Sequence, residues 1–146
     1  MVDITVLVVQ SGAAERARTV GALSLSCEPA RIGNVGGVEE AVDFLLGRGT
    51  HADRAGARVP QFLLVDLPTA AGVRLLDAVR AEPPIAGLPV IALLDQGLRA
   101  EHDDWYRAGA NSIVGKTVDD EELGQKLRRL HEYWTTVNVA ARISRI

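Results

Sequence analysis

The chain has 146 residues, of which 47% are hydrophobic and 24% are charged, and this composition is typical of a single globular domain. The net charge of −3 shows no basic excess and argues against a nucleic-acid partner. No apolar run is long enough to span a membrane, and the single cysteine, Cys27, excludes an intramolecular disulfide and suits a cytoplasmic protein.

The first part of the chain alternates twice between strand and helix. The β-branched run at 4–9 predicts a strand buried on both faces, and an apolar stripe predicts a helix over 11–25 with Ser11 as its N-cap. Residues 30–35 predict a weaker strand at an edge of a sheet. A second helix is predicted over 36–49, ended by one of its last glycines.

The middle of the chain opens with residues 50–60, which are polar, contain Gly and Pro, and predict a loop. The apolar stretch 61–66 predicts a third strand that carries an aspartate at its end. A helix is predicted over 71–82, where two prolines stop it, and the fully apolar stretch 88–94 predicts a fourth strand.

The last elements are a helix predicted over 98–110, a short strand over 111–115 and a long helix over 117–137. Thr117 or Asp119 is the predicted N-cap of that last helix, because acidic residues fill its first turn and basic residues come later.

This alternation predicts the fold class. Strands buried on both faces and separated by helices predict a flavodoxin-like α/β fold, a (βα)5 three-layer sandwich with a parallel sheet in the order 2-1-3-4-5 and an extended C-terminal helix. The domain would cover residues 1–137, and 138–146 would be a C-terminal tail. Strands 1 and 3 are neighbours in this order, so Asp66 would lie at the crevice beyond their carboxyl ends.

Four segments of the sequence resemble receiver domains of two-component response regulators. They are VLVV in the first strand, LLVDLP in the third, LPVIALL in the fourth and AGANSIVGKTV around the fifth. The resemblance spans about residues 4–137. The segment LRRLHEYWTTVNVAARI also resembles the longer tail of the small receivers that partner phytochromes, through Tyr133, Trp134 and Val137.

The resemblance implies a chemistry. Receivers take a phosphoryl group from a phosphohistidine onto an aspartate at the end of strand 3, and they mainly position groups and neutralise charge. An acid pair after strand 1 helps to hold Mg²⁺, a Ser or Thr follows strand 4, a Lys follows strand 5, and an aromatic residue in strand 5 changes rotamer. By this resemblance Asp66 is the phosphoacceptor position and Lys116 is the phosphate-pairing lysine.

The other positions depart from the family's pattern. The acid pair is replaced by Gln10 and Ser11, the Thr by Leu94 and the aromatic switch by Ile113. Mg²⁺ prefers carboxylates, so we expect no cofactor or only weak Mg²⁺ binding through Asp66. A lost oxyanion donor, such as the one missing at Leu94, is worth roughly 3 kcal/mol in a site built for it.

Several readings of these residues stay open. The stretch after Asp66 is shorter than in the family, because Pro68 follows by two residues, which predicts a truncated loop. Asp66 and Lys116 form either a structural pair across strand ends or a working phosphorylation site. Cys27 is expected to be a packing residue, and His102 with its acidic neighbours is expected on an exposed helix face rather than in a metal site.

The last helix carries a stripe that would dock on the sheet, formed by Leu123, Leu127, Leu130 and Trp134. Further apolar side chains exceed what the domain can bury and predict a partner surface: Tyr133, Trp134, Val137, Val139 and Ile143. The hypothesis is a homodimer through this helix and tail. The alternative is a helix that packs only on its own domain and frays at its end.

The preferred function is therefore a stand-alone receiver-like protein of two-component signalling, without enzymatic activity. It would act by contact with a sensor kinase or an output protein and would be phosphorylated poorly. Two alternatives remain: a working phosphoacceptor that uses Asp66, and an unrelated small α/β ligand-binding protein or enzyme.

Overall fold

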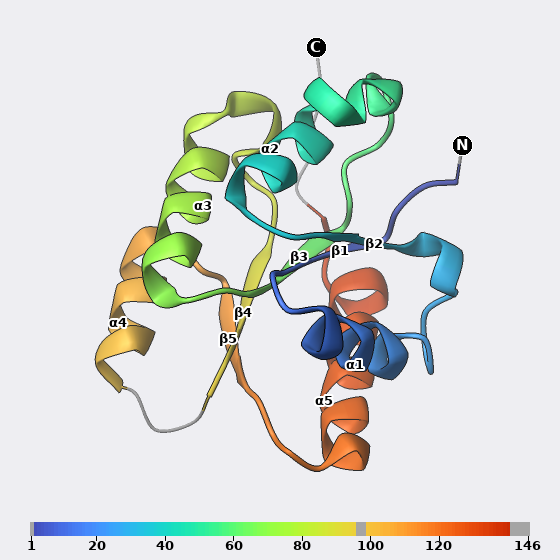
Figure 1. Cartoon of the computed structure of the whole chain (residues 1–146), viewed down its shortest axis with the longest axis vertical. Helices are drawn as coiled ribbons and strands as arrows, with labels where there is room; N and C mark the ends of the chain where they lie inside the picture. Colours follow the sequence, from blue (N-terminus) through green and yellow to red (C-terminus); the bar gives the residue numbers. More distant parts are fainter. Residues whose placement is uncertain (1, 96–98, 141–146) are drawn as a thin grey trace.

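The computed structural model describes residues 2–95 and 99–140. One parallel sheet in the order β2-β1-β3-β4-β5 lies at its centre (Figure 1). The strands are β1 Val6–Gln10, β2 Ile32–Val35, β3 Phe62–Asp66, β4 Val90–Leu94 and β5 Ser112–Gly115. The helices are α1 Ala13–Leu23, α2 Val38–Leu46, α3 Thr69–Ala81, α4 Arg99–Ala108 and α5 Asp120–Glu132. This is the predicted flavodoxin-like fold with the predicted strand order.

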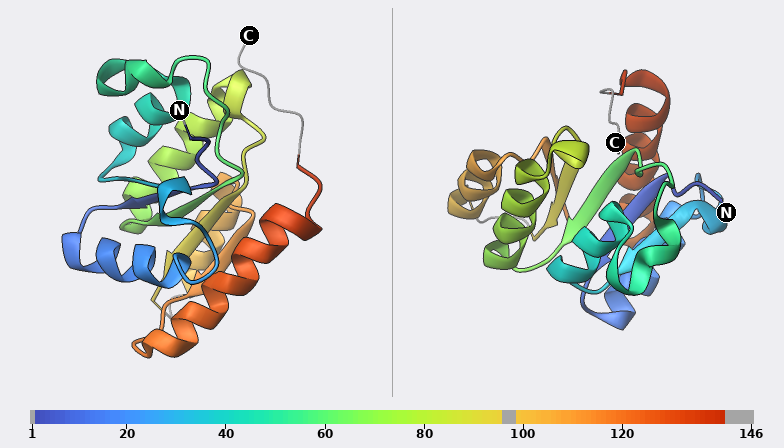
Figure 2. Two further views of the ribbon diagram at one scale, coloured as in Figure 1. Left: turned by 90° about the vertical axis from the view of Figure 1, so that its right-hand side faces the viewer. Right: turned by 90° about the horizontal axis from the view of Figure 1, so that it is seen from above.

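The sheet separates two hydrophobic cores because alternate residues of each strand face opposite sides. Leu7 and Val9 of β1 lie in a core that α2, α3 and α4 cover. Val6 and Val8 lie in a second core that α1 and α5 cover. The helices thus form two layers, with α2, α3 and α4 on one face and α1 and α5 on the other (Figures 1 and 2).

The segment predicted as a loop over 50–60 is partly ordered as a short 3₁₀-helix, Gly49–Arg54. Its polar residues are held by contacts with α2. The guanidinium of Arg54 lies 4.0 Å above the ring of Phe44, and the His51 ring packs edge-on against the same ring at 5.1 Å. A cation–π contact between distant residues leaves no local signal in the sequence, so composition alone predicted a loop.

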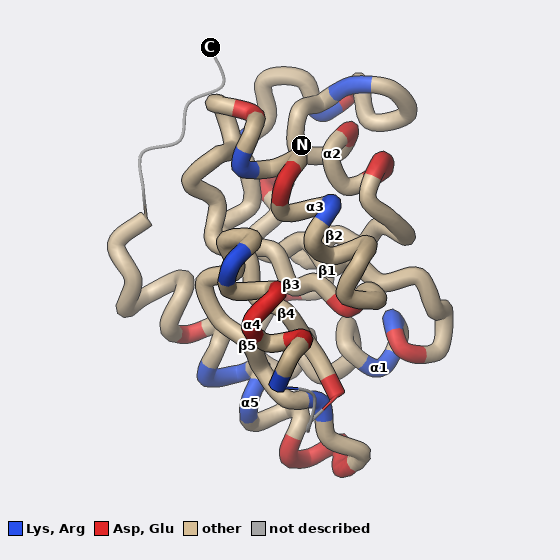
Figure 3. Tube along the Cα trace, turned by 90° about the vertical axis from the view of Figure 1, so that its left-hand side faces the viewer, with Lys and Arg blue, Asp and Glu red and all other residues tan. Residues whose placement is uncertain are grey.

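Two helix starts can be compared with their predictions. The prediction that Ser11 caps α1 is wrong, because the N-cap is Gly12 and no side chain accepts a hydrogen bond there. For α5 the N-cap is Asp119, whose carboxylate accepts hydrogen bonds from the backbone N–H groups of Glu121 and Glu122 at 2.9 and 3.4 Å. The acidic first turn and the basic residues that follow it complement the helix dipole (Figure 3).

The helices α3 and α4 meet through one close contact. Trp105 of α4 is fully buried, and a Cβ atom placed on Gly72 of α3 would lie only 1.9 Å from its ring. Only glycine leaves room for this indole at position 72. The indole N–H also donates to the Thr69 hydroxyl at 3.2 Å, so α4 is fixed to the first turn of α3 by packing and by a hydrogen bond.

The chain beyond α5 continues as a π-helical turn, Tyr133–Val137, in agreement with the predicted extension. The predicted stripe docks on the sheet: Leu123 and Leu127 are buried, and Leu130 and Trp134 pack against the same core. The prediction for Ile143 falls outside the described residues. Across residues 2–95 and 99–140, no helix is both long and apolar enough to cross a membrane.

Candidate functional site

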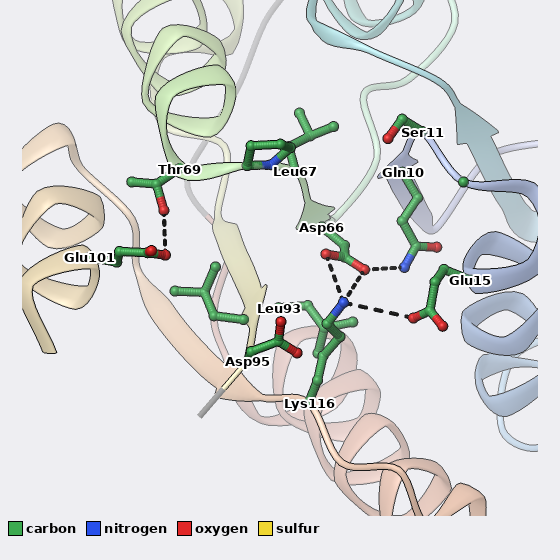
Figure 4. Close-up of a pocket in the computed structure, with 13 residues that line it drawn as sticks. Gln10, Ser11, Glu15, Asp66, Leu67, Thr69, Leu93, Asp95, Glu101 and Lys116 are labelled. Carbon is green, nitrogen blue, oxygen red and sulfur yellow. Dashed lines mark hydrogen bonds and ion pairs between the residues drawn. The ribbon is translucent and has the colours of Figure 1, made fainter. Parts of the chain in front are cut away.

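A cavity of about 480 Å³ opens at the carboxyl ends of β1, β3 and β4, where the fold predicted a crevice (Figure 4). Asp66 ends β3 and stands beside Gln10, which ends the neighbouring strand β1. The backbone N–H of Lys116 donates to the carbonyl of Leu94, so this lysine directly continues the pairing of β5 with β4. Local strand geometry therefore brings Asp66, Gln10 and Lys116 together from three separate parts of the sequence.

Asp66 and Lys116 form an ion pair with two close contacts. The Nζ atom of Lys116 lies 3.0 Å from Oδ2 and 3.2 Å from Oδ1 of Asp66. The side chain of Asp66 is 16% exposed and that of Lys116 is 18% exposed, so water screens the pair only partly. Glu15, in the first turn of α1, lies on the other side of the ammonium group at 3.7 Å.

The surroundings of Lys116 favour its charged form. Burial alone would lower the pKa of Lys116, but the hydrogen bond to Asp66 and the charges of Asp66, Asp95 and Glu15 outweigh burial and leave the pKa raised. The lysine therefore stays an ammonium ion at neutral pH and is not available as a base.

Gln10 supplies a further hydrogen bond to the same carboxylate. Its side chain is 1% exposed, and its Nε2 atom donates to Asp66 Oδ2 at 2.7 Å and to the Thr19 hydroxyl at 2.9 Å. The ionised Asp66 accepts and does not donate, so the amide must turn its nitrogen toward it. In place of an acid that would attract a cation, the chain presents a hydrogen-bond donor.

This set of groups does not fit Mg²⁺, which the receiver fold implies. Magnesium needs an octahedral shell of oxygen ligands. Near Asp66 the Gln10 amide presents nitrogen, and the ammonium of Lys116 contacts both carboxylate oxygens. In the part of the chain that the structure describes, no three Asp, Glu, His or Cys side chains gather as metal ligands. Ser11 lines the cavity as a neutral hydroxyl.

The two other departures from the receiver pattern are also placed at the site. Leu94 lines the cavity and is 6% exposed, with its side chain in the core that α3 and α4 cover. Ile113, beside Ala92 in the sheet, packs against that same core. Neither aliphatic side chain can donate a hydrogen bond. Only Leu67 and Pro68 separate β3 from α3, which agrees with the predicted short loop.

Sequence reasoning missed three groups around the crevice: Glu15, Thr19 and the pair Thr69–Glu101. The Thr69 hydroxyl donates to Glu101 Oε2 at 2.7 Å while accepting from Trp105, and both Thr69 and Glu101 line the cavity. For Glu15 a signal was present, because it falls in the first turn of the helix that follows β1. Such a residue lies at the carboxyl edge of the sheet.

Two lesser predictions concern other side chains. Cys27 is 4% exposed in the core under α1 and α5, and burial raises the pKa of its thiol, so its role as a packing residue is confirmed. His102 lies on α4 as predicted but is half-buried there rather than exposed, and no metal-binding cluster includes it within the described residues.

The surface predicted on the last helix is only partly covered. Tyr133 is 46% exposed and packs edge-on against Trp134 at 4.9 Å, while Val137 and Val139 are 67% and 91% exposed. A second cavity of about 610 Å³ lies between β5 and the end of α5, lined by Trp134 among others. Tyr133, Val137 and Val139 are therefore exposed apolar side chains, whereas Trp134 packs against the core under α1 and α5, and a partner on this surface stays a prediction.

Comparison with protein-family profiles and with curated proteins finds no match to the sequence. Comparison with solved structures finds close likenesses. A response regulator in red-light signalling of R. palustris superposes with a TM-score of 0.83 at 22% identity, covering 95% of this chain and 99% of that one. The phosphorylated cyanobacterial phytochrome response regulator RcpA gives 0.81 at 22% identity, over 97% and 100% of the two chains.

A receiver domain from Rhodospirillum rubrum gives a TM-score of 0.73 at 22% identity, covering 95% of this chain and 99% of that one. These likenesses extend over nearly the whole length of each protein. The chain therefore has the fold of response regulator receiver domains, including those associated with phytochromes.

Proposed function

We propose that this chain is a receiver-like protein of two-component signalling that works in the cytoplasm by contact with other proteins and that accepts phosphate poorly at Asp66. The observation that carries the proposal is the hydrogen-bonded group of Gln10, Asp66 and Lys116. The receiver fold supplies the signalling context, and the altered crevice supplies the expected loss of phosphorylation.

The physical argument concerns charge. Phosphoryl transfer depends on positioning and on cations that neutralise the developing charge of the phosphoryl group. Here the oxygens of Asp66 already accept hydrogen bonds from Gln10 and Lys116, and attack on phosphorus would require breaking some of these contacts. Leu94 offers no hydrogen-bond donor to a phosphoryl oxygen. The free energy lost by breaking the contacts of Asp66 would therefore not be offset by a new hydrogen bond in the transition state.

The test is to incubate the protein with acetyl phosphate and Mg²⁺ and to measure its intact mass over time. Little or no phosphate adduct is expected, and Asp66→Asn is the matched control. A stoichiometric adduct that forms on the wild type and is absent from Asp66→Asn would contradict the proposal and favour a working phosphoacceptor.

A homodimer through the last helix and tail is the second part of the proposal. Its support is the exposed apolar set of Tyr133, Val137 and Val139 beside the half-buried Trp134. Aromatic side chains at a surface commonly anchor protein interfaces. A sensor kinase or an output protein is the other partner class that the receiver fold suggests.

A further inference from the structure

A groove runs between α3 and α4 and adjoins the cavity around Asp66, with which it shares Thr69 and Glu101 in its lining. It encloses about 640 Å³. Its apolar lining comes from Ala70, Val73 and Ala108, and its charged lining comes from Asp77, Glu101, Asp104 and Arg107. The lining of the groove therefore combines apolar side chains with charged ones, of which three are acidic and one is basic.

The acidic side chains of the groove lining are only partly neutralised within the described chain. The one guanidinium, Arg107, lies 3.5 Å from Asp104, and both side chains are exposed. Glu101 accepts a hydrogen bond from Thr69 and forms no ion pair, and Asp77 forms none with the described residues. A segment that combines aliphatic side chains with positive charge would complement such a groove.

The C-terminal segment of the chain has that composition. Residues 139–146 read VAARISRI, with aliphatic side chains at Val139, Ile143 and Ile146, basic side chains at Arg142 and Arg145, and no acid. Val139 is 91% exposed. Eight extended residues reach roughly 27 Å, while the part of α3 that lines the groove, Thr69 to Asp77, is about 12 Å long.

The layers of the fold indicate which copy would supply the segment. The groove lies on the face covered by α2, α3 and α4, whereas α5 packs on the opposite face with α1 (Figure 2). The end of α5 and the groove of one copy therefore lie on opposite faces of the same sheet. A second copy can approach the groove directly from solvent.

We propose that residues 139–146 of one copy dock in the α3–α4 groove of a second copy, and that the exchange is reciprocal. The proposal rests on the homodimer proposed above and specifies where its tail binds. In this arrangement the aliphatic side chains of the tail would contact the apolar lining, and its two arginines would pair with Asp77 and Asp104. The symmetric exchange buries two such contacts in each dimer.

The test uses charge reversal in the full-length chain. One variant reverses the groove with Asp77→Arg and Asp104→Arg, and the other reverses the tail with Arg142→Glu and Arg145→Glu. Each variant alone should dimerise at least roughly tenfold more weakly by analytical ultracentrifugation, because like charges would face each other. An equimolar mixture of the two should form a heterodimer, since both of its contacts again join opposite charges.

Matched controls are Asp103→Arg, exposed on α4 outside the groove lining, and Arg128→Glu, exposed on α5. Neither should change dimerisation. If the wild type dimerises and either reversal leaves its affinity unchanged, or if mixing fails to produce the heterodimer, docking in the groove is wrong while the dimer itself stands. A wild type that is monomeric at all concentrations would overturn both proposals.

Discussion

The ion pair at the crevice is the first feature whose strength can be tested at a single residue. The folded state raises the pKa of Lys116 above 10.5, so the ammonium form stabilises the fold. This stabilisation is fully present below the pKa of the unfolded chain. It is lost as the pH rises through the higher pKa of the folded state.

We therefore expect Lys116→Met to lower the free energy of unfolding by about 2 kcal/mol near neutral pH, the scale of a hydrogen bond to a charged group. The difference from the wild type should shrink as the pH rises above 10.5 and through the raised pKa of Lys116 in the folded state. Urea unfolding followed by circular dichroism over a pH series measures this. A difference that stays constant up to the highest pH at which the wild type folds would show that the ion pair is not its source.

Gln10 offers a second test at residue scale. Replacing it in Gln10→Asp removes the donor to Asp66 and places two carboxylates side by side. Without a cation the variant should be less stable than the wild type because the like charges repel each other. Mg²⁺ should restore the stability of the variant. It should also bind the variant about tenfold or more tightly than it binds the wild type, which is the usual change in metal affinity when a residue at a metal site is substituted.

Isothermal titration with Mg²⁺ and the melting temperature with and without Mg²⁺ give the two readings. Thr19→Val is the matched control, because it removes the other partner of the Gln10 amide without adding charge. If Gln10→Asp binds Mg²⁺ no better than the wild type, then the amide is not what keeps the cation from this crevice.

The main positions of the site could be predicted from sequence, whereas their contacts could not. Asp66 and Lys116 follow from strand ends and from the receiver-like segments, both of which are local patterns. The direction of the Gln10 amide, the reach of Glu15 toward Lys116 and the bond from Thr69 to Glu101 depend on rotamers and helix placement. Those are decided by packing between distant segments.

At the scale of elements, the contact between α3 and α4 gives a prediction that opposes helix propensity. Alanine is favoured over glycine inside a helix by about 1 kcal/mol. Gly72→Ala should nevertheless destabilise the protein, by roughly 1–3 kcal/mol, because the new methyl group would collide with the buried ring of Trp105. Thermal and urea unfolding provide the measurement.

Gly21 in α1 is the matched control, because a Cβ atom there meets no heavy atom within 4 Å. Gly21→Ala should stabilise the protein by about 0.5–1 kcal/mol. If the two substitutions have effects of the same sign and size, the indole does not restrict position 72 as described.

The buried strands could be predicted from the sequence, whereas the short 3₁₀-helix and the start of α1 could not. Strands such as 61–66 are apolar throughout because both of their faces are buried, so they are clear in the sequence. The 3₁₀-helix Gly49–Arg54 was missed because the contact of Arg54 with Phe44 holds it, and nothing in the local composition reports this contact. The mistaken cap at Ser11 shows that a capping residue type does not fix the residue at which a helix begins.

At the scale of the whole molecule, the proposed dimer can be tested by shortening the chain. A chain ending at Thr136 lacks Val137 and Val139, which are both exposed, together with the rest of the tail. It should keep the melting temperature of the domain within a few degrees because little buried surface is lost. Its mass by light scattering should fall from that of a dimer to that of a monomer.

A truncation that unfolds the domain would also abolish dimers. The melting temperature of the shortened chain is therefore the necessary control. A truncated chain that melts like the wild type and retains the mass of a dimer would rule out the last helix and tail as the interface.

The two tryptophans lie in different environments, so their intrinsic fluorescence can report on two separate parts of the protein. Trp105 is fully buried between α3 and α4, whereas Trp134 is half-buried at the end of α5 next to the exposed Tyr133. Their fluorescence should differ in wavelength and in access to a quencher such as iodide. Binding at the last helix would change the emission of Trp134 alone, and loosening of α4 would change that of Trp105.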